Sequence, residues 1–382
     1  MQSTYKPIGK YIREVKTRNT EGIVSNLLGV NIDKYFMPSV ANIVGTDMTK
    51  YKVVKKGQFA CNRMHVGRDK RLPVALSTSE EDFLVSPAYD VFEIKDENVL
   101  NPEYLMMWFS RKEFDRNAWF YTDADVRGGL HWKAFCEMTL HIPSLEKQKE
   151  IVAEYNTIVN RIKLNEQLNQ KLEETAQAIY KQWFVDFEFP DENGKQYKSS
   201  GGEMEYCDKL ECEIPRVWSA GTIADIYTLQ YGKGNNNPDN GGKYPVYGSN
   251  GVIGGFGEYN NEDAPVIGHI GINCGSLVFA YGKHFVTYNG VMCNIKNPMR
   301  KFYGYATLQS KDLKSQTRGS SQPFVSYDML YELPIVIPKD SVIESFCKYA
   351  NHLYEYSGKV LKEQMFLGQM CSVVLSKMTK AS

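Results

Sequence analysis

The chain has 382 residues with 45 basic and 45 acidic side chains, so its formal net charge is zero. A nucleic-acid site would therefore have to come from local patches, because the chain has no basic bias. No apolar run reaches the ~18 residues of a transmembrane helix, and the N-terminus lacks the apolar core of a signal peptide. We expect a cytoplasmic protein of two or three domains with reduced cysteines.

Residues 1–143 combine short strands with short helices, which predicts an α+β unit. Asn101-Pro102 is a typical helix start, because proline is tolerated at the first helical position. The predicted elements are an amphipathic segment at 5–16, strands at 27–30, 51–54, 83–85, 91–94 and 138–142, and helices at 103–110 and 132–137.

One segment of this unit, residues 61–71, is locally basic. It holds four cations, a histidine and a glycine in eleven residues. One interpretation is a loop that contacts DNA phosphates and base edges. The other is an ordinary solvated hairpin, and the sequence leaves both open. The candidate DNA-binding residues here are Arg63, His65, Arg68, Lys70 and Arg71.

Residues 144–184 contain neither proline nor glycine and carry a heptad seam, the pattern of a long helix with a partner helix. Four of the five seam positions are apolar, and the fifth is Asn165. At 1.5 Å per residue the helix is roughly 60 Å long. The seam residues are Ile151, Ile158, Asn165, Leu172 and Ile179.

The sequence then passes through a linker at 185–204 into a second unit, 205–338, which is rich in glycine, asparagine and tyrosine. Its Gly-Asn clusters at 231–242 and 244–257 are either turns or places where the backbone approaches a ligand closely. Strands are predicted at 264–269, 276–280, 285–287 and 291–295.

The final segment, 339–382, carries a second heptad seam, offset from the first by 195 residues (346 − 151) through five heptads. The approaches to the two helices also match, which indicates an internal repeat of a domain plus a long helix. If the two helices pack side by side and antiparallel, the chain gains a pseudo-twofold character. The second seam consists of Phe346, Leu353, Val360, Leu367 and Val374.

Asn165 is the one polar seam position, where the second helix has Val360. A single buried asparagine often fixes the register of a coiled coil at some cost in stability. If it does only that, Asn165→Val should stabilise the chain. If Asn165 has a specific polar partner, or faces another subunit, the same change should destabilise the chain or its assembly.

A search for catalytic and metal motifs favours a protein that is not itself an enzyme. Asn101-Pro102-Glu103-Tyr104 differs by one residue from the tetrapeptide of amino-methyltransferases, but no glycine-rich methyl-donor loop precedes it. Neither a dinucleotide fingerprint nor a phosphate-binding loop occurs. Cys207 and Cys212 have no second pair at zinc-finger spacing, so we expect no metal site.

Two divergent units joined by long helices suit a reader of two half-sites on duplex DNA. A duplicated interaction module is the alternative.

Several motifs, in this order and spacing, resemble the DNA-specificity (S, HsdS) subunits of Type I restriction–modification systems. The resemblance extends over essentially all of the chain. The motifs are WFVDFEFP at 183–190, NGK at 193–195, GGEM at 201–204, EIP with Trp218, YPVYGSNG at 244–251, GSSQP at 319–323 and IVIP at 335–338.

The resemblance implies two target recognition domains with mixed, β-rich cores, each reading one half of a bipartite, asymmetric double-stranded DNA target. It implies that the antiparallel helices set the gap between the halves and dock two modification (methyltransferase) subunits, which restriction (translocase and nuclease) subunits then join. The chain would be non-catalytic and bind no cofactor. S-adenosylmethionine, ATP and Mg²⁺ would belong to the partners. The alternative is a duplicated coiled-coil interaction or anti-restriction module without base readout, and a true methyltransferase ranks third.

The sequence departs from the family at the Pro-Pro-Leu-x-x-Gln signature before each helix. The first copy keeps Pro143, Leu145 and Gln148, whereas the second copy lacks the glutamine, which puts the equivalence of the two helix starts in doubt. Recognition domains diverge within the family, so among the remaining candidates only those in 247–251 and 319–322 carry over by motif. The others rest on residue type, since arginine, lysine, asparagine and glutamine pair with base edges. The remaining candidates are Arg127, Lys233, Asn235, Asn236, Tyr247, Asn250, Lys283, Arg318, Ser320 and Gln322.

Overall fold

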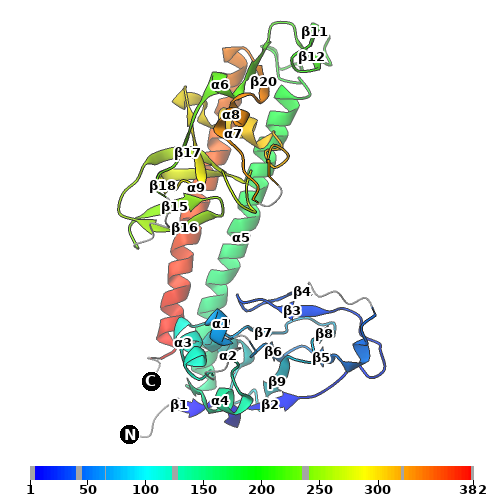
Figure 1. Cartoon of the computed structure of the whole chain (residues 1–382), viewed down its shortest axis with the longest axis vertical. Coiled ribbons are helices and arrows are strands. Elements are labelled where there is room, and N and C mark those ends of the chain that lie inside the picture. The colour runs from blue at the N-terminus through cyan, green and yellow to red at the C-terminus, as the bar shows by residue number, and fades with distance from the viewer. Residues whose placement is uncertain are drawn as a thin grey trace. The chain divides into compact units, whose positions relative to one another are not determined.

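The computed structural model describes residues 5–39, 45–64, 66–122, 128–234, 241–319 and 322–379. The chain divides into two compact units. Unit 1 holds residues 1–163 and 364–382, and unit 2 holds residues 164–363. Two long helices, α5 (Leu145–Phe184) and α9 (Asp340–Lys377), contribute to both units (Figure 1). Among the described helices, none combines the length and the apolar character that crossing a membrane requires.

Unit 1 is built on a four-stranded antiparallel sheet in the order β2-β9-β6-β7, with three two-stranded pairs, β1-β10, β3-β4 and β5-β8. Its elements are β1 (Tyr5–Pro7), η1 (Ile8–Lys10), β2 (Ile12–Val15), β3 (Leu28–Val30), β4 (Phe36–Pro38), η2 (Met48–Lys50), β5 (Lys52–Val54), β6 (Phe59–Cys61), α1 (Val66–Asp69), β7 (Val74–Leu76), β8 (Phe83–Val85), β9 (Asp90–Ile94), α2 (Pro102–Phe109), α3 (Lys112–Phe120), α4 (Trp132–Glu137) and β10 (Thr139–His141).

The predicted helix start at Asn101-Pro102 is confirmed. The Asn101 side chain accepts a hydrogen bond from the Tyr104 amide at 3.0 Å, which satisfies one of the free amides of the first turn. Gln148 then ties the start of α5 to this point. Its amide group donates to the Val99 and Pro143 carbonyls, both at 2.9 Å, and its side-chain oxygen accepts from the Asn101 amide at 2.8 Å. This fully buried glutamine therefore fixes the first turn of α5 within unit 1.

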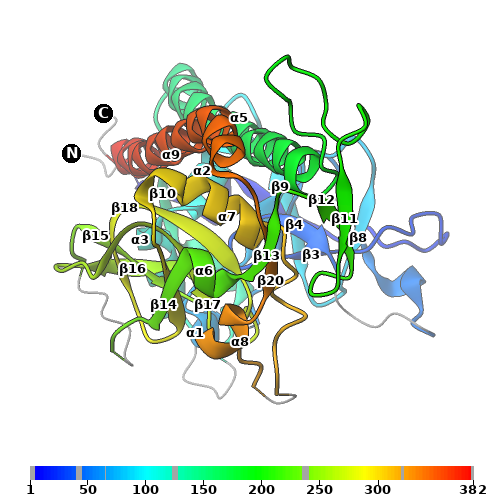
Figure 2. The ribbon, with the colours of Figure 1, turned by 90° about the horizontal axis from the view of Figure 1, so that it is seen from above.

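Unit 2 is built on a six-stranded sheet in the order β14-β19-β17-β18-β15-β16, antiparallel except for the β15–β18 pair. Two further strand pairs are β11-β12 and β13-β20; Figure 2 shows β13 and β20 close to α6 and α8. Its elements are β11 (Met204–Cys207), β12 (Cys212–Pro215), β13 (Ser219–Thr222), α6 (Ile223–Ile226), β14 (Tyr227–Tyr231), β15 (Tyr244–Gly248), β16 (Gly251–Phe256), β17 (Asn261–Gly268), β18 (Leu277–Val286), β19 (Gly290–Ile295), η3 (Pro298–Arg300), α7 (Lys301–Gln309), α8 (Tyr327–Tyr331) and β20 (Pro334–Ile337).

The helices α5 and α9 pack against each other in each unit, and all ten heptad-seam residues are buried or half-buried. In unit 2, Asn165 bonds Glu363 while Gln177 bonds Tyr354. As the residue number rises along α5 it falls along α9, so the pair is antiparallel, as expected. In unit 1, the Lys377 ammonium lies 2.7 Å from the Glu154 carboxylate. The core of each unit therefore includes one stretch of both helices.

The internal repeat extends from the helices to the elements that precede them. α4, β10 and α5 follow one another in unit 1, and α8, β20 and α9 follow in unit 2. The first residues of these elements differ by the same 195 positions (327 − 132, 334 − 139 and 340 − 145). The two helix starts are therefore equivalent, although Ile343 replaces the glutamine of the first copy. In each unit the strand before the long helix pairs with a strand that a short helix follows: β10 pairs with β1, which leads into η1, and β20 pairs with β13, which leads into α6.

Three predicted segments differ in the structure. Residues 5–16 are not one amphipathic element, because β1 and β2 pair with different strands far along the chain, β10 and β9. The basic segment 61–71 lies in the connection between the antiparallel strands β6 and β7, as in the hairpin interpretation, but this connection contains the helical turn α1 and is not a simple loop. The strands expected at 276–280 and 285–287 form a single strand, β18, in which Gly282 takes a positive φ of 70°.

The glycine-rich stretch 244–257 forms a strand hairpin, β15–β16, where we expected turns or exposed backbone. One of its glycines, Gly255, is required by close packing. A Cβ placed on Gly255 would lie 2.3 Å from the Gly242 carbonyl oxygen, so no other residue fits there without a shift. A strand with so many glycines lacks the alternating apolar pattern by which strands are predicted, which explains the error.

Candidate nucleic-acid interface

Several loops of unit 2, which follow strands of the six-stranded sheet or connect α7 to α8, are joined to one another. We name this surface the unit 2 rim. It consists of residues 231–234, 249–250, 269–276, 287–289, 317–319 and 322–324.

The rim is held together by hydrogen bonds between loops that are distant in sequence. The Gly271 amide donates to the Pro323 carbonyl at 2.9 Å, and the Ser276 hydroxyl donates to the Ser249 carbonyl at 2.9 Å. The Tyr288 amide donates to the Gly234 carbonyl at 3.1 Å. The loops therefore act as one structural unit, and their exposed side chains have fixed neighbours.

Four of the predicted site residues lie on this rim with exposed side chains: Lys233, Asn250, Arg318 and Gln322. Arg318 is held by a double backbone pairing with Phe324 at 2.9 and 2.8 Å. Gly319, which follows it, has a φ of +90° that other residues rarely adopt. The rim thus presents two cations and two amide side chains, the groups that pair with phosphates, guanine and adenine.

An aromatic cluster lies beneath and beside these polar groups. The Tyr231 ring is 4.2 Å from the His269 ring and 4.8 Å from the Tyr327 ring, measured between centroids. Burial raises the pKa of the Tyr231 hydroxyl, so this hydroxyl is a neutral group at physiological pH. Tyr288, also packed on His269, remains 43% exposed and offers an amphipathic surface at the rim.

Two predicted residues of unit 2 lie elsewhere. Tyr247 is 9% exposed and packs within a hydrophobic cluster with Val266 and Val286, so its role is in the core. Burial also raises the pKa of its hydroxyl. Lys283 pairs with Glu262 in the β17–β18 ladder, and its ammonium lies 4.5 Å from the centre of the Tyr259 ring. Its position in the sheet, away from the rim, favours a cation–π role.

In unit 1, the basic segment surrounds α1, a single helical turn. Gly67 of this turn meets Gly128 so closely that a Cβ on Gly67 would lie 2.6 Å from the Gly128 Cα. The Gly67 amide donates to the Gly128 carbonyl at 2.7 Å. This contact joins the turn to the loop before α4, and Gly128 has a positive φ, of 55°.

The cations of this segment divide into exposed and anchored groups. The Arg68 side chain is 68% exposed. Among the ion pairs of the described residues, Arg68 takes part in one, with the neighbouring Asp69 at 2.6 Å. Lys70 is exposed and its ammonium lies 4.9 Å from the centre of the Trp119 ring. Arg71 contacts Asp33 at 2.8 Å and Asp115 at 3.7 Å, so its charge is shared with two carboxylates. Arg68 and Lys70 therefore remain the better phosphate-binding candidates.

Arg63 has a different environment from its neighbours. Its guanidinium donates to the Asp90 carboxylate at 2.6 Å and to the Leu130 carbonyl, and it lies 5.6 Å from the Trp132 ring. The side chain is 18% exposed. These contacts favour a structural role in joining β6, β9 and α4, because a base contact would require breaking them.

The structure adds candidate site residues to those predicted from the sequence. In unit 1, Trp119, Phe120 and Tyr121 end α3 beside Lys70, and Phe120 is 82% exposed. The run of three aromatic residues was the available signal. In unit 2, Ile272 and Asn273 lie on the rim, and Ile272 is 94% exposed. The other candidates, His65, Arg127, Asn235, Asn236 and Ser320, lie outside the described residues.

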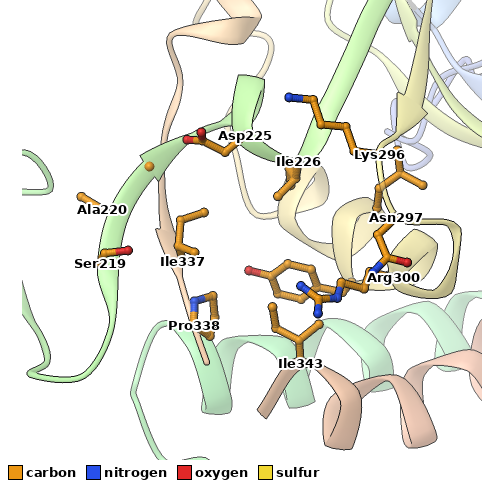
Figure 3. A pocket seen from close by; sticks show the side chains of 13 residues that line it. Ser219, Ala220, Asp225, Ile226, Lys296, Asn297, Arg300, Ile337, Pro338 and Ile343 are labelled. Carbon is orange, nitrogen blue, oxygen red and sulfur yellow. The ribbon is translucent and has the colours of Figure 1, made fainter. Parts of the chain in front are cut away.

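A cavity of about 350 Å³ lies in unit 2 between β13, β20, η3 and the start of α9 (Figure 3). Arg300 on its wall is 2.9 Å from the Asp340 carboxylate, and the Lys296 ammonium donates to the Ala224 carbonyl at 2.7 Å. Its cations are therefore already bound within the protein.

In the described parts of the chain, no three histidine, cysteine, aspartate or glutamate side chains gather as a metal site would require, and the eight cysteines are free thiols.

A second surface of interest is a stripe of exposed apolar residues on the C-terminal part of α9 in unit 1. We name it the α9 stripe; it consists of Met365, Phe366, Met370 and Val373, which are between 52% and 66% exposed. Met365 and Phe366 are adjacent, and Met370 and Val373 follow at steps of four and three residues, which places all four on one side of the helix. An exposed apolar surface of this kind is typical of protein–protein contact sites.

The chain is similar to known proteins along much of its length. A family model described as Type I restriction modification DNA specificity domain matches residues 74–174 and 215–343. The HindI specificity subunit of Haemophilus influenzae is 26% identical over 210 residues, which cover 53% of this chain and 44% of that protein. The MjaIX specificity subunit of Methanocaldococcus jannaschii is 23% identical over 312 residues, covering 72% of this chain and 68% of that protein.

Among solved structures, the S subunit of a Type I restriction-modification system from M. genitalium has a TM-score of 0.55 at 17% identity. The likeness covers 98% of this chain and 95% of the other, and it shows a shared fold. The two segments matched by the family model include one from each globular part and together exceed half of the sequence. The chain therefore belongs to the Type I restriction modification DNA specificity domain family.

Proposed function

We propose that this chain is the DNA-specificity subunit of a Type I restriction–modification complex and reads a bipartite, asymmetric target in double-stranded DNA. The observation that carries the proposal is the unit 2 rim. Lys233 and Asn250 come from two separate loops and Arg318 and Gln322 from a third, yet hydrogen bonds hold these loops in one surface. Cations bind phosphates and position the protein, whereas amide side chains discriminate adenine in the major groove.

Unit 1 supplies the second reader through the surface formed by α1 and the end of α3. Arg68 and Lys70 provide positive charge, and Trp119 and Phe120 provide aromatic surface. The two reading surfaces share no side-chain arrangement, although the elements that lead into α5 and α9 repeat at a constant offset. Two different readers on a repeated framework would recognise two different half-sites, which makes the target asymmetric.

The chain acts in this proposal as a non-catalytic subunit that positions its partners. Modification subunits, two per chain, carry S-adenosylmethionine and transfer its methyl group to adenine. Restriction subunits use ATP and Mg²⁺. The chain's own part is to bind DNA and to dock the modification subunits.

The α9 stripe is the docking surface that we propose for a modification subunit. Burying methionine, phenylalanine and valine side chains that are more than half exposed would stabilise such a complex through the hydrophobic effect. Phe366→Ala should weaken co-purification of the methyltransferase subunit, because aromatic residues often dominate the energy of an interface. Phe120→Ala is the matched control, since Phe120 is also highly exposed but lies on the reading surface of unit 1.

The test of the function is to express the chain with its modification subunit and to sequence the methylated bases of the host genome. A bipartite methyladenine motif is the expected result. Arg318→Gln combined with Gln322→Ala should relax one half of that motif and leave the other half intact, because both residues lie on the unit 2 rim. Lys209→Gln is the control: it removes an exposed charge from the β11–β12 turn of the same unit and should leave the motif unchanged.

The outcome also separates this function from a duplicated interaction module without base readout. Such a module would co-purify with a methyltransferase yet produce no bipartite motif. Methylation that is unaffected by the double variant would remove the unit 2 rim from the interface.

A further inference from the structure

Ile272 occupies an unusual position on the unit 2 rim. It lies in the loop between β17 and β18 and is 94% exposed, the most exposed of the large hydrophobic residues in the described chain. Gly271 before it has a φ of +92°, which turns the chain outward at this point. Single exposed aliphatic side chains are common on protein surfaces, but this one gains nothing for folding by facing water and is free to contact a ligand.

The exposure of Ile272 does not come from a loose loop. The residues on both sides are bonded to their surroundings: the Gly271 amide to the Pro323 carbonyl, and the Cys274 amide to the Gly271 carbonyl, each at 2.9 Å. Cys274, two residues after Ile272, is 4% exposed, so its side chain packs into the core. Gly275 lies so close to Leu313 that an added Cβ would be 2.8 Å from the Leu313 carbonyl oxygen. Ile272 is therefore held outward on a fixed support.

The groups around Ile272 are polar. Asn273 donates a hydrogen bond from its amide to the side-chain oxygen of Asn250 at 2.5 Å, which fixes both side chains beside the loop. Asn250, Arg318 and Gln322 are exposed on the same rim. One apolar side chain is thus presented among amides and a guanidinium, a combination that matches the edges of base pairs in the major groove. There, the thymine C5-methyl is the apolar feature among hydrogen-bond donors and acceptors.

We propose that Ile272 contacts the C5-methyl group of a thymine in the half-site read by unit 2. The inference rests on the proposed DNA-reading function and adds a specificity-determining residue and the base that it recognises. Asn250, Arg318 and Gln322 make the polar contacts, and Ile272 excludes water from the thymine methyl. Cytosine at this position would lack the methyl group and present a donor where thymine has an acceptor.

The test uses the complex of the chain with its modification subunit and a duplex that carries the motif found by methylation sequencing. Each thymine of the unit 2 half-site is replaced in turn by deoxyuridine, which removes one methyl group and leaves base pairing intact. For the wild-type complex, one replacement should weaken binding by about fourfold, the effect of one buried methyl group. Ile272→Ala should weaken binding to the thymine duplex by at least that factor and should be insensitive to the same replacement.

Met299→Ala is the matched control. Met299 is an apolar residue of the same unit, 79% exposed, but it lies in η3 and away from the rim. The complex with Met299→Ala should bind the thymine and deoxyuridine duplexes with the wild-type affinities. Thermal unfolding of both variants should match the wild type, because neither side chain is buried.

Three results would overturn the inference: a half-site without thymine, equal binding of wild type and Ile272→Ala, or Ile272→Ala binding that stays sensitive to the same deoxyuridine. Failure of the proposed function looks different, because the wild-type complex would then bind no sequence in preference to others.

Discussion

The Asn165 side chain donates a hydrogen bond from Nδ2 to the Glu363 carboxylate at 3.0 Å, across the two helices within unit 2. Asn165 is 1% exposed, whereas Glu363 is half-buried. The sequence left two explanations for a polar residue in the apolar seam: fixing the register alone, or meeting a specific polar partner. The structure favours the second, because the carboxylate of Glu363 provides that partner.

Asn165→Val should therefore destabilise the chain. The variant leaves a half-buried carboxylate without one of its donors, which costs about 1–3 kcal/mol of unfolding free energy. Denaturant unfolding measures the change. Asn160→Val makes the same substitution at an exposed position of α5 and should have little effect. A more stable Asn165→Val protein would restore the register-only explanation.

Phe346 is the aromatic residue of the two heptad seams, and its ring packs in the aromatic core of unit 2. It is fully buried, with ring centroids 5.2 Å from Phe184 and 6.0 Å from both Tyr180 and Trp183. Phe346→Ala should lower the unfolding free energy by about 3–5 kcal/mol, the usual cost of emptying such a site. Calorimetry of Phe346→Ala and Phe366→Ala checks that Phe346, and not Phe366, contributes to the core. Phe366 is 66% exposed on the same helix, and equal losses for the two variants would contradict it.

Removing the charges of Arg68 and Lys70 should reduce the salt dependence of DNA binding by the assembled complex. If each residue neutralises a phosphate, the slope of log K against log salt becomes shallower by about 0.9 per residue. Glutamine at both positions removes the charges without placing a new carboxylate beside Asp69. Arg71 is left unchanged, because two carboxylates already hold it.

Lys16→Gln serves as the control for this measurement. Lys16 is in unit 1, outside the basic segment, and 76% of its side chain is exposed. It should leave the slope unchanged. A slope that stays the same in the Arg68 and Lys70 variant would take α1 out of the DNA interface.

Glu173 should make stability depend on pH. Burial raises the pKa of its carboxyl above the ordinary value of 4.5. The native state therefore binds a proton more tightly than the unfolded state. The unfolding free energy falls as pH rises from about 4.5 through the raised pKa of Glu173, and the loss is complete above that pKa. Burial raises the pKa values of Tyr281, Tyr305 and Tyr354, and the Glu173 carboxylate raises them further.

Glu173→Gln keeps the shape of the side chain and removes the charge. It should raise the melting temperature at pH 7 and flatten the fall in stability across this window. Melting curves of both proteins at several pH values provide the measurement. A variant that is less stable than the wild type at pH 7 would show that the ionised carboxylate makes a favourable contact.

The sequence by itself determined the long helices, their antiparallel pairing and the repeat. The helices depend on local patterns, heptad spacing and the absence of proline and glycine over 144–184, the repeat depends on the equal offset of the two seams, and the antiparallel direction was implied by the family resemblance. Asn101 and its proline likewise predicted the start of α2, because capping involves only neighbouring residues.

The tertiary structure alone decided which polar residues share a surface. Arg63 and Arg68 look equivalent in the sequence, yet Asp90 and Leu130 hold one while the other faces solvent. Tyr247 lies in a motif of the family but is buried, and Ile272 looks like an ordinary core residue but is exposed. The physical reason is distance along the chain: a heptad is set by neighbours a few residues apart, whereas the rim is set by contacts such as Gly271 to Pro323, which form only when the sheet is complete.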